Sequence, residues 1–276
     1  MKQQVTQRRV TPLVSIVVAT LMLAGCSAGQ PVNPSFPLTV SEARTALEEM
    51  DRLPIAPARP VVVAGGIIDP GFIAPALARR LQQATADDAP IISVSFFGAN
   101  SFDACRDRLI AEVERAWPSD GGSQTIEVDV VGCSMGGLVA RHAARPRDHG
   151  RCLAVRRLFT IATPHRGASL AGLPTFDQRA VDMRAGSPFL AGLEAEAATY
   201  ELFAYTRLDD AIVGEENAAP PGRWAWWVPN QMFEGGHLDA WRDPRILADL
   251  CRRLRGEPTY ATEAPAPVPG TSEEVE

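Results

Sequence analysis

Lysine is almost absent from this chain of 276 residues: Lys2 is the only one, and the other 26 basic residues are arginines. These arginines form no basic block, and 33 acidic residues outnumber them, so the formal net charge is −6. An acidic protein without a basic patch lacks the electrostatic footprint of a nucleic-acid binder. We therefore expect no nucleic-acid partner.

A long apolar run is also missing. Residues 13–24 (LVSIVVATLMLA) carry no charge, but twelve residues make only ~18 Å of helix, and a hydrocarbon core is ~30 Å thick. Lys2, Arg8 and Arg9 precede this run, and small residues follow it, an order typical of a secretory signal. Removal of residues 1–25 would take away these three cations and no acid, which brings the net charge to −9.

The apolar run ends in Leu-Ala-Gly-Cys-Ser, with the cysteine at position 26. This segment resembles the lipobox of bacterial lipoproteins. The resemblance implies cleavage before Cys26, lipidation of Cys26, and anchoring of the protein to a membrane of the cell envelope, facing the periplasm or the exterior; several acyl chains together make such anchoring stable. A plain secretory signal with a coincidental cysteine is the alternative.

Composition divides the rest of the chain into three parts. Residues 26–40 contain three prolines and no charge, and we expect a tether. Residues 41–255 form the expected folded domain, and residues 256–276, rich in proline and acid, are expected to be disordered. The Gly65-Gly66 pair lacks the GxGxxG spacing of a dinucleotide site, and no Cys/His spacing indicates zinc, so we expect neither a cofactor nor a metal.

Strand and helix patterns alternate along the central part of the chain. Short apolar runs predict strands, and helical spacing of apolar residues predicts helices between them. The expected strands are 60–64, 91–97, 124–131, 155–162 and 200–205, and the expected helices are 41–52, 72–84, 103–117, 135–144 and 241–255. This alternation predicts an α/β fold with a mostly parallel sheet and helices on both faces.

The strongest motif is Gly132-Cys133-Ser134-Met135-Gly136, which fits GxSxG between a predicted strand and a predicted helix. A sharp strand-to-helix turn strains the backbone of the central residue and crowds the positions two residues away, where only glycine fits. The turn presents the Ser134 hydroxyl at the top of the sheet and at a helix N-terminus, where developing negative charge is stabilised. Ser134 is therefore the candidate nucleophile.

A serine nucleophile needs a base, and the chain has four histidines: His142, His149, His165 and His237. On the fold that GxSxG indicates, the order is serine, acid, histidine. His237, in a glycine-containing loop before the last helix, fits this order best. His165 lies at the correct end of the sheet, but it precedes the expected acid, and it remains a weaker candidate.

The acid is expected after the last predicted strand, where a carboxylate would orient the imidazole and stabilise its protonated form. Asp209 and Asp210 both lie there. The oxyanion hole needs two backbone N–H groups. Met135, directly after the nucleophile, supplies the first, and the turn after the first strand supplies the second, at Ile67 or, next in preference, Gly66.

Three segments together resemble the bacterial lipase and esterase branch of the α/β-hydrolases: residues 61–66 (VVVAGG), 132–138 (GCSMGGL) and 161–167 (IATPHRG). The resemblance covers about residues 58–255, and the last segment resembles the TPHxG signature of triacylglycerol lipases and of deacylases of inositol-linked lipids. It implies an α/β-hydrolase fold, Asp210 rather than Asp209 as the acid, and a structural role for His165. Gly65 and Cys133 depart from the family, which commonly has histidine at both positions.

The expected function is thus a membrane-anchored serine esterase or lipase that cleaves carboxylic esters through an acyl-enzyme, with Ser134, His237 and Asp210 as the triad. An acyltransferase with the same triad is one alternative, and a non-catalytic anchored binding protein that retains the fold is another. The segment 169–193 is either a cap over the site or a loop packed on the core. The tryptophans at 224, 226 and 227 either line an acyl pocket or pack in the core.

Four cysteines remain besides Cys26, at positions 105, 133, 152 and 251. An extracytoplasmic location would permit disulfides. Cys152 precedes a predicted strand and Cys251 lies late in the last predicted helix, so both are expected at the same end of the sheet. A Cys152–Cys251 bond is therefore our expectation.

Overall fold

The computed structural model describes residues 31–86, 88–172, 174–231 and 234–271. Contacts divide the chain into two units, residues 1–31 and 32–276, and every strand and helix named here belongs to the second. The expected signal peptide and the lipidation site Cys26 lie outside the described residues. Among the helices that the structure describes, none is long and apolar enough to cross a membrane.

Six strands form one fully parallel sheet, in the order β2-β1-β3-β4-β5-β6. The strands are β1 Val61–Ala64, β2 Ile91–Val94, β3 Val128–Cys133, β4 Val155–Ile161, β5 Glu201–Arg207 and β6 Trp226–Val228. The helices are α2 Val40–Arg52, α3 Ile73–Thr85, α4 Phe102–Ala116, α5 Met135–Ala144, α6 Gln178–Asp182, α7 Pro188–Glu194 and α8 Pro244–Arg255. The predicted α/β fold is confirmed, and β6, too short to give a pattern of its own, is an addition to it.

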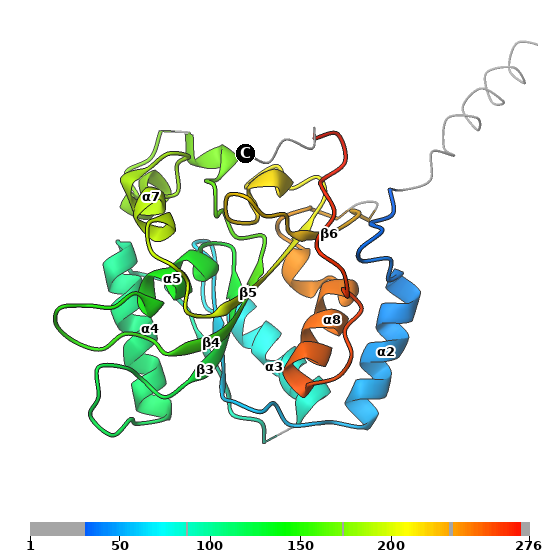
Figure 1. Cartoon of the computed structure of the whole chain (residues 1–276), viewed down its shortest axis with the longest axis horizontal. Helices are drawn as coiled ribbons and strands as arrows, with labels where there is room; N and C mark the ends of the chain where they lie inside the picture. Colours follow the sequence, from blue (N-terminus) through cyan, green and yellow to red (C-terminus); the bar gives the residue numbers. More distant parts are fainter. Residues whose placement is uncertain (1–30, 87, 173, 232–233, 272–276) are drawn as a thin grey trace, which may run out of the picture. The chain divides into compact units, whose positions relative to one another are not determined.

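Helices cover both faces of this sheet (Figure 1), with α2, α3 and α8 on one face and α4, α5 and α7 on the other. Successive side chains of β1 point to opposite faces of the sheet, so this one strand contributes to the hydrophobic clusters on both faces. Val61 and Val63 pack in the cluster with α2, α3 and α8, whereas Val62 and Ala64 pack in the cluster with α4 and α5. Because both faces are buried, the strands are apolar at nearly every position.

Local capping chemistry sets several helix boundaries. Thr39 and Glu42 form a reciprocal capping box at the start of α2. The expected last helix begins three residues later than the sequence predicts: residues 240–242 form a 3-10 turn, and α8 begins at Pro244 behind the N-cap Asp243. Proline at the first helical position favours this start, and Gly256, with φ 71°, ends the helix.

Two described segments that flank the core differ from the sequence prediction. Within the expected tether, residues 33–38 pack on the domain: Phe36 is 2% exposed, and the Asn33 side chain donates to the Trp227 carbonyl at 2.7 Å. The expected disordered tail also packs as far as residue 271, and its Val268 is 4% exposed. Apolar side chains spaced along these proline-rich segments give them a surface to bury.

The expected Cys152–Cys251 disulfide is wrong, because all four cysteines in the described part of the chain are free and buried. Cys251 lies on α8 and packs in the layer that contains α2 and α3. Cys152 lies just before β4, in a bridge with Gln124, and its Sγ contacts the carbonyl of Ser123. The two thiols therefore belong to different surroundings.

Candidate active site

The parallel sheet brings the loops that follow β1, β3, β5 and β6 to one edge, where the predicted site residues lie. Ser134 stands between β3 and α5 with φ 51° and ψ −125°. Such a conformation is rare for a residue with a side chain, and it marks strain held by the surrounding structure. The Ser134 N–H donates to the Ile161 carbonyl at 2.8 Å, which ties the turn to β4.

The two glycines of GxSxG are required by close backbone approach. A Cβ atom on Gly132 would lie 2.5 Å from the Cα atom of Gly137, and one on Gly136 would lie 2.2 Å from the carbonyl oxygen of Ala64. Neither backbone can move away without disturbing β1 or α5. The turn predicted from the motif is therefore present, with the crowding that the motif implies.

Ser134, His237 and Asp210 form one hydrogen-bonded chain. The His237 Nε2 atom lies 3.0 Å from Ser134 Oγ, and its Nδ1 atom lies 2.8 Å from Asp210 Oδ2. His237 is 9% exposed and Asp210 is 2% exposed. Since a carboxylate can only accept, Nδ1 carries the proton and Nε2 is free to accept one from Ser134. This is the arrangement of a serine activated by an oriented base.

The structure distinguishes Asp209 from Asp210, the two adjacent candidates for the acid. Asp210 is buried against His237, and its Oδ1 atom accepts from the backbone N–H groups of Ile212 and Val213 at 3.0 and 2.9 Å. Asp209 is exposed and adopts a left-handed conformation with φ 61°. Asp210 is thus the carboxylate that contacts the candidate base.

The loop after β1 lies beside the nucleophile. A Cβ atom on Gly66 would be 3.3 Å from the Ser134 Cβ atom, so this glycine keeps the space over the hydroxyl open. Within the described residues, neither Met135 nor Ile67 donates its N–H to another backbone group. The assignment of these two amides to the oxyanion hole stays a prediction.

Asp69 fixes this loop, and the sequence analysis did not identify it. Its carboxylate is 1% exposed and accepts four backbone N–H groups at 2.9–3.0 Å, from Gly71, Phe72, Ile73 and Ala74. These are donors that the start of α3 would otherwise leave unpaired. The Asp-Pro-Gly sequence before a helix is the signal that could have indicated this anchor.

His165 does not contact the nucleophile. It is fully buried, with its Nδ1 atom 3.1 Å from Arg141 Nη1 and its Nε2 atom 3.1 Å from Thr160 Oγ1. A guanidinium only donates, so the proton of this imidazole resides on Nε2. Burial, and then the charge of Arg141, hold the pKa of His165 well below its usual value, which keeps it neutral. The expected structural role fits this environment.

A buried arginine holds the loop that carries His237. Arg207, at the end of β5, is fully buried, and its Nη2 atom donates to Asn230 Oδ1 and to Glu234 Oε2, both at 2.7 Å. Its Nε atom lies 3.4 Å from a carboxylate oxygen of Asp243, the N-cap of α8. Arg207 therefore joins both ends of the His237 loop to the sheet, a role that sequence spacing could not reveal.

A small cavity of about 40 Å³ adjoins the Ser134 hydroxyl. Its lining is mostly apolar and includes Ile68, Ile73, Ile161, Leu238 and Trp241. Cys133, which also lines it, is buried, and burial together with the charge of Asp69 raises the pKa of its thiol to about 12. At neutral pH this thiol is protonated and a poor nucleophile, so Ser134 is the nucleophile this cavity offers.

This cavity is lined neither by segment 169–193 nor by the tryptophans at 224, 226 and 227. For both, the sequence left open a role at the site or packing on the core. The indoles of Trp226 and Trp227 donate to carbonyls of the C-terminal segment, which indicates packing. In segment 169–193, Phe189 stacks on Phe102 of α4, and Leu190 is buried in the same layer. This part of the segment is packed on the core, while residues 170 and 176 remain exposed.

The sheet, its helical layers and the strand–serine–helix turn make an α/β-hydrolase fold. In sequence, residues 107–183 match the family model of a PGAP1-like alpha/beta domain. This match covers less than a third of the chain. A comparison with curated proteins finds no match.

Several solved structures are similar to this chain in fold, all at low sequence identity. The propeptide form of lipase BlEst2 from Bacillus licheniformis gives a TM-score of 0.49 at 14% identity, over 77% of this chain and 54% of that one. A hyperthermophilic esterase from the archaeon Pyrobaculum calidifontis gives a TM-score of 0.44 at 14% identity, over 90% of this chain and 99% of the esterase. Phospholipase PlaB from Legionella pneumophila gives a TM-score of 0.42 at 14% identity, over 58% of this chain and 45% of PlaB. This chain thus spans less than half the length of PlaB.

Proposed function

We propose that this chain is a serine hydrolase of carboxylic esters, with Ser134 as nucleophile, His237 as general base and Asp210 as the group that orients it. The observation that carries the proposal is the continuous hydrogen-bonded chain from Ser134 through His237 to Asp210. It stands at a strained turn after β3, with Gly66 of the loop after β1 beside it, and we assign the oxyanion hole to the amides of Met135 and Ile67. No single one of these features would suffice.

The first half-reaction forms an acyl-enzyme. His237 Nε2 accepts the Ser134 proton as Oγ attacks the ester carbonyl, and the amides of Met135 and Ile67 donate to the resulting oxyanion. Collapse of the tetrahedral intermediate breaks the bond to the alcohol oxygen, which takes the proton from His237. The carboxylate of Asp210 stabilises the imidazolium during this step.

The second half-reaction uses water in place of the alcohol. His237 accepts a proton from the water as it attacks the acyl carbon, and the same two amides stabilise the second oxyanion. The carboxylic acid leaves, and Ser134 regains its proton from His237. Every proton is accounted for by side chains present at the site.

The surface around the cavity favours an amphiphilic or apolar ester. Nine large apolar side chains are strongly exposed in the described part of the chain, and six of them lie on loops that follow β1, β2, β4 and β6: Ile68, Phe72, Phe97, Leu170, Phe176 and Leu238. Ile68 and Leu238 also line the cavity itself. Exposed apolar side chains gathered at one edge mark a binding surface for apolar groups.

Labelling and turnover together test the proposal. We expect a fluorophosphonate to label the wild-type domain and not its Ser134→Ala variant, and we expect p-nitrophenyl butyrate hydrolysis to fall to background in that variant. Product analysis in the presence of added alcohol measures acyl transfer against hydrolysis. Equal labelling or equal rates in both proteins would refute the assignment of Ser134.

We further propose that the protein is anchored to a membrane of the cell envelope through lipidated Cys26. The support is the order of charged start, short apolar run, small residues and cysteine in the sequence. We expect the full chain to fractionate with membranes and its Cys26→Ala variant to leave them. Mass analysis of the N-terminal peptide should show acyl chains on Cys26, and an unmodified peptide would disprove the anchor.

A further inference from the structure

The cavity beside Ser134 ends after a short distance. One water-sized group needs roughly 10–15 Å³ of such space, so about 40 Å³ accommodates three or four groups of that size. Its lining includes Ala240 and Trp241, which follow His237 in the chain. As it stands, the cavity can take a short acyl group and not a long chain.

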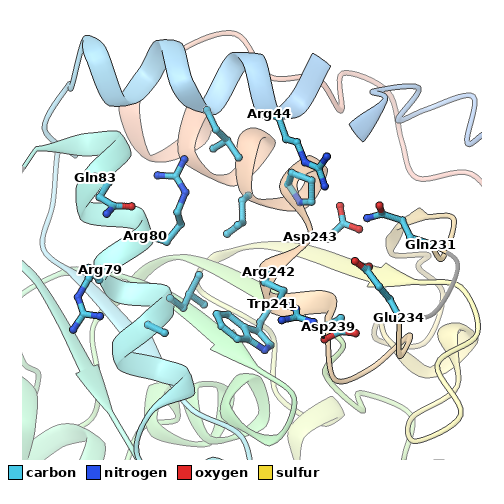
Figure 2. A pocket seen from close by; sticks show the side chains of 15 residues that line it. Arg44, Arg79, Arg80, Gln83, Gln231, Glu234, Asp239, Trp241, Arg242 and Asp243 are labelled. Atoms are coloured by element: carbon cyan, nitrogen blue, oxygen red, sulfur yellow. Dashed lines mark ion pairs between the residues drawn. The ribbon is translucent and has the colours of Figure 1, made fainter. Parts of the chain in front are cut away.

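A second, much larger cleft adjoins Trp241, which Figure 2 shows among the side chains that line it. Its volume is about 470 Å³, and it is formed by α2, α3, the start of α8 and residues 231, 234, 239, 241 and 242. Leu47, Leu77 and Leu247 give it an apolar interior, while arginines and acids stand around its margin. Trp241 lines both this cleft and the cavity beside Ser134.

The position of Trp241 is fixed from within its own loop. It is the middle residue of the 3-10 turn 240–242, in which the Ala240 N–H donates to the His237 carbonyl and the Asp243 N–H to the Ala240 carbonyl, both at 3.3 Å. Ala240 is 1% exposed, and the Trp241 ring packs against the core cluster of α2, α3 and α8. The turn that carries this ring is thus tied to His237 by a backbone hydrogen bond.

The order of the two half-reactions indicates which part of an ester would face Trp241. The alcohol must leave before water can enter, so it needs an open path, whereas the acyl group stays bonded to Ser134 and can occupy a closed space. Ile68 and Leu238 line the cavity and are also exposed, so together with the exposed Phe72 they form its open side. The less exposed side is lined by the buried Ala240 and the half-buried Trp241.

We infer that Trp241 sets the acyl-chain limit of this site, and that the substrates are esters of a short acyl group with a larger, apolar alcohol. The inference rests on the proposed function. It implies that the larger cleft adjoining Trp241 is space that a longer acyl chain would enter once the ring is removed. Trp241 is accordingly a specificity-determining residue, not a catalytic one.

The test compares acyl-chain profiles of p-nitrophenyl esters, from acetate to decanoate. We expect wild type to favour butyrate or shorter esters. Trp241→Ala should raise the decanoate-to-butyrate ratio of kcat/KM by at least about tenfold, because a hydrophobic pocket that gains or loses room for a methylene changes its discrimination by such factors. Trp241→Phe should shift the ratio less. Trp224→Ala, which removes another half-buried tryptophan away from the cavity, is the matched control and should leave the ratio unchanged.

A binding measurement separates failure of this inference from failure of the proposed function. Calorimetry with decanoate should give tighter binding to Ser134→Ala/Trp241→Ala than to Ser134→Ala alone, whether or not any ester is hydrolysed. If wild type hydrolyses butyrate through Ser134 but the ratio does not change in Trp241→Ala, the limit lies elsewhere and the inference is overturned. If no ester is hydrolysed, equal decanoate affinities overturn it.

Two further outcomes are decisive. A change in Trp241→Ala that follows the size of the alcohol, measured with butyrate esters of alcohols of increasing length, would overturn the assignment of the acyl group to the cavity. If the alanine variant does not fold, Trp241→Leu removes the ring with less loss of packing and is judged by the same ratio and the same affinities.

Discussion

At the residue scale, two adjacent residues of the same type can differ completely in burial and in what they contact. Asp209 and Asp210 are equivalent by spacing, and only the turn after β5 distinguishes them. The left-handed conformation of Asp209 sends its neighbour inward to His237, where two backbone N–H groups also hold it. The sequence predicts that an acid follows β5, but the direction of each side chain depends on backbone torsions that no local pattern specifies.

The two aspartates give a sharp paired prediction. Asp210→Asn removes the charge that stabilises the His237 imidazolium and favours the wrong tautomer, so we expect kcat to fall by a factor of about 10⁴. Asp209→Asn should change kcat by less than about threefold, because the side chain is exposed and turned away. Steady-state hydrolysis of p-nitrophenyl butyrate by both variants measures this, and similar losses would show that the acid is misassigned.

The other residues of the site also fall into two groups, those that a local sequence pattern predicts and those whose role depends on the fold. Ser134 and His237 could be predicted, because GxSxG is a local pattern and the order of serine, acid and histidine leaves one best candidate. Asp69 and Arg207 could not be predicted with a role, since each acts through groups that the fold brings to it. Arg207 reaches 27 residues along the chain to Glu234, and its sequence context on β5 gives no sign of that partner.

At the scale of elements, the triad depends on how closely two loops approach. A Cβ atom on Gly236, next to His237, would lie 2.3 Å from the Asp209 carbonyl oxygen and 2.7 Å from the Asp210 nitrogen. The His237 loop can therefore reach Asp210 only with glycine at this position. The neighbouring Gly235 is not crowded, because its nearest contact would be an ordinary one of 3.7 Å to Leu238.

This contrast makes Gly236→Ala and Gly235→Ala a matched pair. We expect Gly236→Ala to push the loop away from Asp210 and lower kcat by at least about 100-fold, as displacements of about 1 Å do. Gly235→Ala should retain most of the activity. Kinetics with p-nitrophenyl butyrate, alongside thermal unfolding of both variants, separate lost geometry from lost stability; equal activity in the two would contradict the proposed approach of the loops.

His165 links two elements, since its ring joins Arg141 of α5 to Thr160 of β4. Its folded-state pKa lies well below the usual 6.5 because of burial and the nearby guanidinium. Below about pH 6.5 the unfolded chain binds a proton that the native chain does not, so the free energy of unfolding falls on acidification, by up to ~1.4 kcal/mol per pH unit from this group.

The corresponding prediction concerns how steeply the free energy of unfolding changes with pH, and not its value at one pH. We expect His165→Gln to be less stable than wild type at pH 7.5, where the bonds of the ring are lost, but to lose less stability between pH 6.5 and pH 5. Urea unfolding at several pH values gives both quantities. His142, whose pKa burial also lowers, contributes to both proteins alike, so identical slopes would show that His165 does not carry this pH dependence.

At the scale of the whole molecule, periodicity predicted the core and composition misled at the ends. The alternation of strands and helices reproduced the parallel sheet, because apolar spacing reflects burial directly. The segments that flank the core have proline-rich compositions typical of disorder, yet they bind each other and the edge of the sheet: Ala266 donates its N–H to Ser35 Oγ at 3.0 Å. Composition averages over a segment and misses the few apolar residues that dock it.

Truncation tests whether the C-terminal segment is part of the fold. Removal of residues 259–276 would leave the Trp227 indole without the carbonyls of Ala266 and Pro267 and would uncover the cluster of Val268 and Leu208. Lost hydrogen bonds and apolar burial together should lower the free energy of unfolding by about 2–4 kcal/mol, which lowers Tm by several degrees. Removal of residues 272–276 alone is the control and should leave Tm unchanged. If thermal unfolding of the two truncated proteins coincides, the segment contributes nothing, and the compositional prediction of disorder is the better description of this end of the chain.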